Sequence, residues 1–313
     1  MSIRMLPLYG LLALSLGAAS GQAQQPNFDS VQVATVHIAG GVYMLMGAGG
    51  NIGVSVGDNG VFLVDDQYAP LTPKIAAAVK AIRDEPIRFV LNTHWHGDHT
   101  GGNENMGAAG ALIVAHENVR KRMSVEQFLE AFNLRTPPSP PGALPVVTFT
   151  DAVTFHLNGD EIHVFHVRPA HTDGDAIVHF RTANAIHMGD IFFNGMYPFI
   201  DISTGGSIDG MIAAVNRVLG MIGADTKVIP GHGPLASGAD LETYRDMLVG
   251  VRAEVMRHVV ARRSLERVLA AKPTTRFDAK WGKGFLAPNQ FVELVYRDLV
   301  SRRSARGRQA RTP

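Results

Sequence analysis

The stretch that decides the fold is Asn92–Gly102, which reads NTHWHGDHTGG. It crowds three histidines and one aspartate into six residues: His94, His96, Asp98 and His99. His94 and His96 are two residues apart, so on an extended segment their side chains share one side. Gly97 then permits a sharp turn, so the aspartate and the third histidine can face a second point. Four ligand-type groups around a bend can serve two metal ions; a polar surface loop is the alternative interpretation.

The composition limits both the class of protein and the ligands available to a metal. The chain has 313 residues, 46% of them hydrophobic, with a formal net charge of +1 and no cysteine. This length suffices for one large domain or two small ones. The near-neutral charge gives no reason to expect a nucleic-acid partner. Without cysteine, disulfides are excluded and metal ligands must be His, Asp or Glu, a set that suits zinc, iron or manganese.

Both ends of the chain have a distinctive composition. Arg4, an apolar run over residues 6–19 and small residues up to Ala23 predict a signal peptide at 1–23, and therefore a periplasmic or secreted protein. The run is short for a membrane span of about 20 residues, so a retained anchor is the alternative and no span is expected after cleavage. Residues 301–313 are basic and poor in apolar side chains, which predicts a disordered tail.

Between these ends, apolar runs bounded by glycine and proline predict short strands. They fall at residues 42–46, 51–56, 61–64, 87–91, 111–115, 153–157, 161–167, 176–180, 185–188 and 227–229. Helices are predicted from Pro73 to about residue 82 and at about 116–132, 208–221 and 239–271.

The order of these elements predicts sheets packed face to face with helices outside. We expect one domain over residues 28–300, with a helical extension from about residue 240. The proline-rich segment 136–142 predicts a loop, with a lid over a site or a domain boundary as the alternatives.

Further candidate ligands stand just past later predicted strands. His171 lies in PAHTDGD, Asp190 in MGDIFF and His232 in PGHGP, each beside glycine or proline. Loops at strand ends commonly carry functional side chains. We therefore expect these residues to converge with the first cluster on one rim of the scaffold.

In this order, HWHGDH, PAHTDGD, MGDIFF and PGHGP resemble the metallo-β-lactamase superfamily over about residues 35–240. The resemblance implies an α+β fold, a four-layer αββα sandwich, with up to two metal ions, usually zinc, at one edge. It implies three sets of ligands: His94, His96 and His171 for the first metal, Asp98, His99 and His232 for the second, and Asp190 bridging both. Asp65 resembles the family's acidic residue that supports the ligand loop, with the adjacent Asp66 as the alternative.

The all-His/Asp ligand set is similar to that of glyoxalase II-like and lactonase-like members. Many acquired β-lactamases instead have a cysteine at the position of Asp190, and some have a lysine where this chain has Phe193. In such sites a water between two cations loses a proton near neutral pH and attacks an acyl carbon. Asp98 is the residue expected to orient that hydroxide.

These observations predict an exported dinuclear zinc hydrolase that opens an acyl bond in a small molecule, most specifically a β-lactam, with weak or promiscuous activity included. The alternatives are a lactonase or thioesterase, a mononuclear iron enzyme acting on sulfur compounds, and a non-catalytic metal-binding periplasmic protein. The sequence leaves the oligomeric state open. It also leaves open whether the aromatic-rich segment 277–299 caps the fold or mediates self-association.

Overall fold

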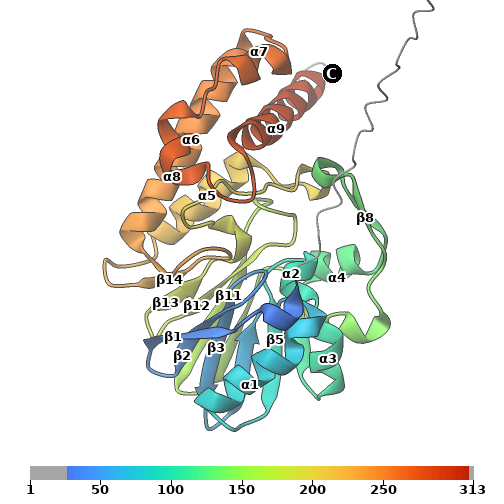
Figure 1. Ribbon diagram of the computed structural model, residues 1–313, viewed down its shortest axis with the longest axis vertical. Helices are drawn as coiled ribbons and strands as arrows, with labels where there is room; N and C mark the ends of the chain where they lie inside the picture. The colour runs from blue at the N-terminus through green and yellow to red at the C-terminus, as the bar shows by residue number, and fades with distance from the viewer. Residues whose placement is uncertain (1–26, 310–313) are drawn as a thin grey trace, which may run out of the picture.

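The computed structural model describes residues 27–309, with side chains up to residue 304. The predicted signal peptide at 1–23 lies outside the described residues. Two β-sheets pack face to face, and helices cover the outer face of each sheet (Figure 1). This arrangement confirms the predicted α+β fold with four αββα layers. Within residues 27–309, none of the helices has the length and apolar character needed to span a membrane.

The first sheet has seven strands in the order β1-β2-β3-β4-β5-β6-β9. Its strands are β1 (Ala34–Ala39), β2 (Val42–Met46), β3 (Ile52–Gly57), β4 (Gly60–Val64), β5 (Ile87–Asn92), β6 (Leu112–His116) and β9 (Val147–Phe149). The hairpins β1 to β4 are antiparallel, and β4, β5, β6 and β9 run parallel. The helices of this half are α1 (Thr72–Ile82), α2 (Gly97–Thr100), α3 (Asn103–Ala108) and α4 (Glu117–Met123).

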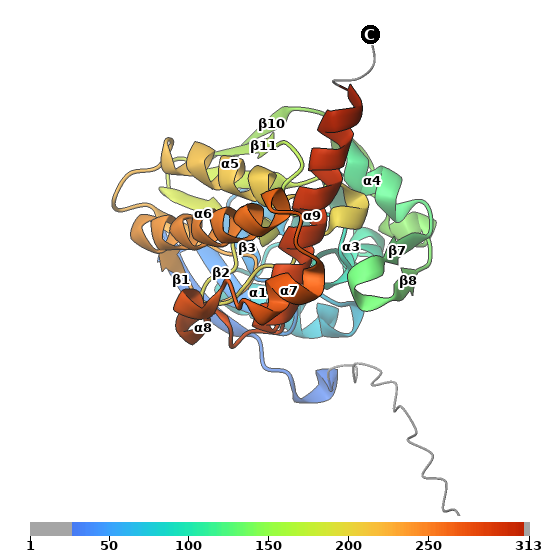
Figure 2. The same ribbon diagram turned by 90° about the horizontal axis from the view of Figure 1, so that it is seen from above.

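The second sheet has six strands in the order β10-β11-β12-β13-β14-β15. They are β10 (Ala152–Leu157), β11 (Asp160–His166), β12 (Ala176–Phe180), β13 (Ala185–His187), β14 (Lys227–Ile229) and β15 (Ala236–Ser237). The helices of this half are α5 (Ile208–Leu219), α6 (Gly238–Val260), α7 (Leu265–Ala270), α8 (Thr275–Trp281) and α9 (Pro288–Gln309). Figure 2 shows α9 crossing beside α6 and α7 at the outer side of this half.

The alternation of side chains along β4 shows how the layers are built. Phe62 and Val64 point between the sheets and pack with residues of the second sheet such as Val178. Leu63 points outward and packs against α1 at Ile75. Every one of these side chains is fully buried, because both faces of the sheet are covered.

Short 3-10 turns complete the connections: η1 (Phe28–Ser30), η2 (Ala69–Leu71), η3 (Glu130–Phe132), η4 (Pro141–Ala143), η5 (Gly189–Ile191) and η6 (Ile202–Thr204).

The helix predicted over residues 116–132 is wrong beyond Met123. The chain instead forms a small hairpin from β7 (Gln127–Leu129) and β8 (Leu134–Thr136). The side-chain amide of Gln127 donates to the carbonyls of Arg122 and Val125, which closes the end of α4. Asn133 adopts the left-handed conformation, with φ of 49°, that the turn of the hairpin requires.

Residues 301–309 of the predicted 301–313 tail also differ from the prediction, because they continue α9 as a helix, and residues 310–313 lie outside the described residues. The guanidinium of Arg302 donates to the carbonyls of Gly205 and Gly206 and pairs with Asp298. Arg303 donates to the carbonyl of Val259 at the end of α6. The predicted helix at 239–271 is likewise divided, since α6 ends at Val260 and α7 begins at Leu265.

Candidate metal centre

The seven predicted ligands come together at one edge of the two sheets, and each follows a buried strand. His94 and His96 follow β5, and Asp98 and His99 lie in α2 directly after them. The remaining three follow β11, β13 and β14 of the second sheet: His171, Asp190 and His232. Potential ligand atoms gather in two groups: His94, His96, His171 and Asp190 in one, and Asp98, His99 and His232 in the other.

Three histidines form the more buried side of the centre. His96 Nδ1 and His171 Nε2 lie 2.9 Å apart. The ring of His94 is 4.8 Å from that of His96 and 4.6 Å from that of His171, centroid to centroid. We call these three residues the histidine triad.

The second group forms the open side of the centre. His99 Nε2 and His232 Nε2 lie 3.4 Å apart. Asp98 Oδ2 is 3.3 Å from His232 Nε2 and 3.6 Å from His99 Nε2. The side chains of Asp98 and His232 are 23% and 21% exposed, whereas His99 is fully buried. We call Asp98, His99 and His232 the rim group, because its exposed members mark where the centre meets solvent.

Asp190 lies between the two groups. Its Oδ2 is 3.5 Å from His171 Nε2 and 3.4 Å from His232 Nε2, and its Oδ1 is 3.1 Å from His99 Nε2. This carboxylate therefore contacts both sides of the centre, as the bridging role implied by the resemblance requires.

The donor set fits divalent metal ions. His94 Nε2 is buried and has no hydrogen-bond partner within the described part of the chain, although buried polar atoms are normally satisfied. His96 Nδ1 and His171 Nε2 face each other as two lone pairs, because the other nitrogen of each ring donates elsewhere. A shared cation resolves both conflicts, and imidazole with carboxylate is a ligand set that suits zinc, iron or manganese.

Partners on the outer side of the rings determine which nitrogen faces inward. His96 Nε2 donates to Asp201 Oδ2 at 3.2 Å, and His171 Nδ1 donates to the carbonyl of Phe199 at 2.9 Å. His94 Nδ1 donates to Thr93 Oγ1 at 3.0 Å. Such partners fix the tautomer and orientation of a metal-binding histidine.

Asp65 supports the rim group from the end of β4. Its Oδ2 accepts from His99 Nδ1 at 2.8 Å and from Thr93 Oγ1, and its Oδ1 accepts from the Thr93 backbone N–H. Asp66, the alternative for this position, faces away and accepts from the backbone N–H of Gly102. Burial raises the pKa of Asp66 well above its ordinary value. The structure therefore places Asp65, and not Asp66, against the ligands.

Asp201, Thr93 and the carbonyl of Phe199 are supporting groups that sequence reasoning missed. Asp201 lies thirty residues after His171 in a segment that follows no strand, so the pattern of ligands at strand ends did not include it. Its carboxylate also accepts from Thr204 Oγ1 at 2.6 Å and from the Ser203 hydroxyl. The available signal was this Asp-x-Ser-Thr sequence, which is typical of a capped turn.

Burial and neighbouring charges shift the pKa values of the two ligand groups in different directions. Burial lowers the pKa of His171 to about 4 and that of His94 well below its usual range. Burial opposes the charged form of His232 too, but Asp190 and Asp98 outweigh it and raise its pKa to about 9. Burial likewise disfavours the charged Asp98, yet His99 and His232 lower its pKa to about 2. Without metal, His94 and His171 are therefore neutral at pH 7, whereas His232 is charged.

Two glycines allow backbone to approach the ligands closely. A Cβ on Gly50 would lie 2.1 Å from His99 Cε1, and one on Gly231 would lie 2.1 Å from Asp190 Oδ1. Neither position has room for a side chain without displacing a ligand. The segment 47–50, between β2 and β3, thus packs directly over the rim group.

Comparisons with known proteins give a consistent family. A structure of a metallo-beta-lactamase from Pontibacter korlensis aligns with a TM-score of 0.57 and 20% identity, over 69% of this chain and 99% of that one, which shows the fold. Hydroxyacylglutathione hydrolases from Polaromonas sp. and Methylococcus capsulatus are 28% and 29% identical, over 52% and 56% of this chain. The 2,4-dinitroanisole O-demethylase subunit alpha of a Nocardioides species is 25% identical over 56% of this chain and 50% of its own length.

The chain spans 55% and 62% of the lengths of those two hydroxyacylglutathione hydrolases. The family model of the metallo-beta-lactamase superfamily matches residues 46–256, about two thirds of the 313 residues, and includes all seven clustered ligands. The chain belongs to the metallo-β-lactamase superfamily.

Proposed function

We propose that the protein is a metal-dependent hydrolase that cleaves an activated acyl bond in a small molecule. The observation that carries this proposal is the pair of ligand groups joined by Asp190, with an exposed side at Asp98 and His232. The hydroxyacylglutathione hydrolases among the relatives support an acyl bond as the target.

The centre would hold two cations. His94, His96 and His171 would bind the first, Asp98, His99 and His232 the second, and Asp190 both. Two such cations lower the pKa of water and polarise a carbonyl oxygen, which is what hydrolysis of an acyl bond needs. We propose zinc for both, with iron or manganese as alternatives for the same donors.

Asp98 is the side chain best placed to act on the attacking water. Its pKa of about 2 keeps it ionised at neutral pH, and it lies at the exposed side of the centre. As a carboxylate it can only accept hydrogen bonds, so it orients a water by accepting one of its protons. Phe193 stacks on His232 with centroids 5.1 Å apart and shields that ligand from solvent.

The ligand geometry serves a lactam, a lactone and a thioester equally, so the choice among them depends on other features of the chain. The predicted export signal favours a β-lactam or a lactone over a cytosolic thioester, and it places the proposed enzyme in the periplasm or outside the cell. Phe193, where some β-lactamases have a lysine for the substrate carboxylate, weighs against a broad β-lactamase. We therefore propose an exported acyl hydrolase with β-lactam and lactone as the first substrates to test.

The test is metal analysis of zinc-reconstituted protein together with hydrolysis of nitrocefin, a lactone and an acyl thioester. Two metals per chain and hydrolysis of at least one substrate are expected. Asp98→Ala and His171→Ala should each lose activity, whereas Asp225→Ala, at an exposed aspartate that belongs to neither ligand group, serves as the matched control. Turnover that survives both site variants contradicts the catalytic assignment, and less than one metal per chain contradicts the dinuclear centre.

A further inference from the structure

Four phenylalanine rings form an arc that joins the two sides of the metal centre. It starts at His232, on which Phe193 stacks at 5.1 Å, centroid to centroid. It continues from Phe193 to Phe285 at 6.3 Å, to Phe132 at 6.5 Å and to Phe199 at 4.8 Å. The ring of Phe199 then lies 5.7 Å from both His96 and His171. We call these four residues the aromatic arc.

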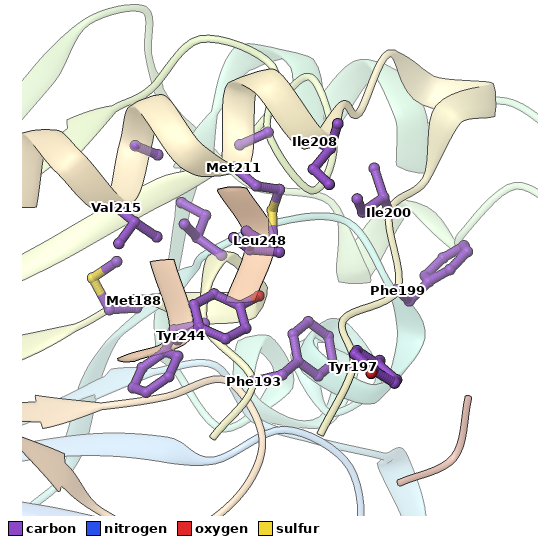
Figure 3. Packing of buried hydrophobic residues seen from close by; sticks show 14 of the residues in the cluster. Met188, Phe193, Tyr197, Phe199, Ile200, Ile208, Met211, Val215, Tyr244 and Leu248 are labelled. Carbon is purple, nitrogen blue, oxygen red and sulfur yellow. The ribbon is translucent and has the colours of Figure 1, made fainter. Parts of the chain in front are cut away.

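The arc is assembled from three separate parts of the chain. Figure 3 shows Phe193 and Phe199 on the segment that leads towards α5. Phe132 comes from η3, in the turn of the β7–β8 hairpin, and Phe285 from the connection between α8 and α9. Phe285 lies outside the region that matches the family model, so the C-terminal extension contributes a side chain that the shared fold does not supply.

Two members of the arc are exposed although they are large and apolar. The side chain of Phe132 is 41% exposed and that of Phe285 is 56% exposed, whereas Phe193 and Phe199 are buried. Apolar surface next to a few convergent polar groups is typical of a ligand site.

A cavity of about 190 Å³ continues from the arc beneath α9. Its apolar wall includes Phe132, Phe199, Leu286 and Leu294. Phe199 therefore faces both the cavity and the histidine triad. A substituent placed along the arc can pass from the metal centre into this cavity without losing apolar contact.

The charged side chains around the cavity disfavour anions. Glu130, Glu293 and Asp201 line it, against a single cation, Arg297. Arg297 is already paired, with its Nη2 2.7 Å from Glu293 Oε1 and its Nη1 3.9 Å from Glu130 Oε1. Among the residues that line the cavity there is neither lysine nor histidine. A carboxylate on the substrate would meet excess negative charge here.

We propose that the aromatic arc and the cavity beneath α9 bind an uncharged apolar substituent, so that the substrates are neutral lactones or esters with an alkyl or aryl group beside the scissile bond. This inference rests on the proposed acyl hydrolase. It goes beyond it by excluding anionic molecules, including carboxylate-bearing β-lactams and glutathione thioesters, as preferred substrates.

The first test compares two lactones that share one scissile bond. The zinc-loaded protein is assayed with γ-butyrolactone and with γ-nonalactone, which carries a pentyl chain. Burial of each methylene raises transition-state binding roughly fourfold, so partial burial of the chain predicts a kcat/KM ratio of at least about tenfold in favour of γ-nonalactone. Phe132→Ala and Phe285→Ala should each reduce this ratio several-fold.

Phe128 provides a matched control, since it lies on the same hairpin, is also 41% exposed and does not belong to the arc. Phe128→Ala should leave the ratio of the two lactones unchanged. A general effect on folding alters both lactones equally and does not move the ratio. The inference is overturned if the wild-type protein does not favour γ-nonalactone, or if Phe132→Ala and Phe285→Ala leave the ratio at its wild-type value.

The second test isolates charge. The esters 4-nitrophenyl hexanoate and the mono-4-nitrophenyl ester of adipic acid have acyl chains of equal length, and only the second ends in a carboxylate. We expect kcat/KM at least about tenfold higher for the neutral ester. The double variant Glu130→Gln with Glu293→Gln should narrow this gap, whereas Glu266→Gln, an exposed glutamate on α7, should not.

The outcomes separate the inference from the proposed function. Equal or preferential hydrolysis of the anionic ester overturns the inference and leaves an acyl hydrolase. Absence of hydrolysis of every lactone, ester, thioester and β-lactam by the zinc-loaded protein overturns the proposed function and the inference with it.

Discussion

The histidine triad and the rim group have similar numbers of donors but are held differently. In the triad every ring has a hydrogen-bond partner on its outer nitrogen, and all three side chains are buried. In the rim group, within residues 27–309, only His99 has such a support, from Asp65, while Asp98 and His232 are about one-fifth exposed. A preorganised site loses less conformational entropy when it binds its ion. We therefore expect the triad to bind its cation first and to retain it longer.

This difference assigns a task to each side. The triad is the fixed side, which would position a carbonyl reproducibly. The rim group is the accessible side, where solvent and substrate can exchange.

Replacing Asp190 should erase the distinction between the two sides, and this is the largest expected effect. Because its carboxylate contacts His171, His232 and His99, Asp190→Ala should lower the affinity for both cations and reduce kcat/KM by roughly 10³-fold or more. Metal content after dialysis and initial rates measure this. Loss of only one metal with activity preserved would contradict a bridging role, and Asp225→Ala again controls for nonspecific effects.

Exchanging the supporting carboxylates should sharpen the comparison. Asp65→Asn should lower the affinity for the second cation, and Asp201→Asn the affinity for the first. Each decrease should be about 10–100-fold, because each carboxylate orients one ligand ring. Competition titration with a chelator of known affinity resolves the two equivalents. If both variants weaken the same equivalent, the assignment of supports to sides is incorrect.

Gly50→Ala should disturb the rim group alone. The new methyl group would overlap the ring of His99, which is fully buried, at a cost of about 1–3 kcal/mol. We expect a lower melting temperature and a weaker second metal. Gly97→Ala is the matched control, because a Cβ there meets no atom within 4 Å among the described residues. Equal behaviour of the two variants would show that segment 47–50 does not press on His99.

The pH should affect the metal affinity of the two sides differently, and this effect is smaller and graded. His232, with its pKa near 9, must release a proton to offer its nitrogen, whereas His171, near 4, is already neutral at pH 7. The apparent affinity of the second cation should rise about tenfold per pH unit for each proton released as the pH approaches 9. The affinity of the first should depend less on pH, because His94 and His171 are already neutral at pH 7. Calorimetry in buffers of different ionisation enthalpy counts the released protons, and equal counts for both equivalents would contradict this picture.

The same shift has the opposite consequence for the metal-free fold. The pKa of His232 is raised above its ordinary value of 6.5, so its ion pairs contribute stability that is complete below about pH 6.5 and is lost as the pH rises through about 9. The melting temperature of the metal-free protein should therefore fall over this interval. His232→Gln should flatten that fall.

The ligands could be located from sequence because each stands directly after a buried strand and occurs in a short distinctive motif. The sheets were predictable for the same reason, since apolar runs between glycine turns reveal strands such as β4 and β5. The supports were not predictable to the same degree. Asp201 reaches His96 across 105 residues through a loop, and nothing in its local sequence specifies that contact.

Two of the predictions that the structure corrects failed for related reasons. Val119 and Met123 stand four residues apart, which is typical of one helix face, but the helix ends at Met123, where the Gln127 side chain donates to the carbonyls of Arg122 and Val125. Residues 301–309 appear disordered by composition, yet Arg302 and Arg303 find carbonyl partners on distant parts of the chain. Composition describes only how strongly a segment favours local order, and it cannot reveal a hydrogen-bond partner 97 residues away.

Asn51 has a consequence for how the protein reaches its native state. Its side-chain amide donates to the carbonyls of Pro230 and Gly233, and its backbone N–H donates to Gly231, across gaps of about 180 residues. These bonds tie the start of β3 to the loop that carries His232. Because contacts at this sequence separation form slowly, we expect the loop that carries His232 to dock on β3 among the last folding events. Binding of the second proposed cation would then follow the last folding step, and its rate would measure how fast the chain matures.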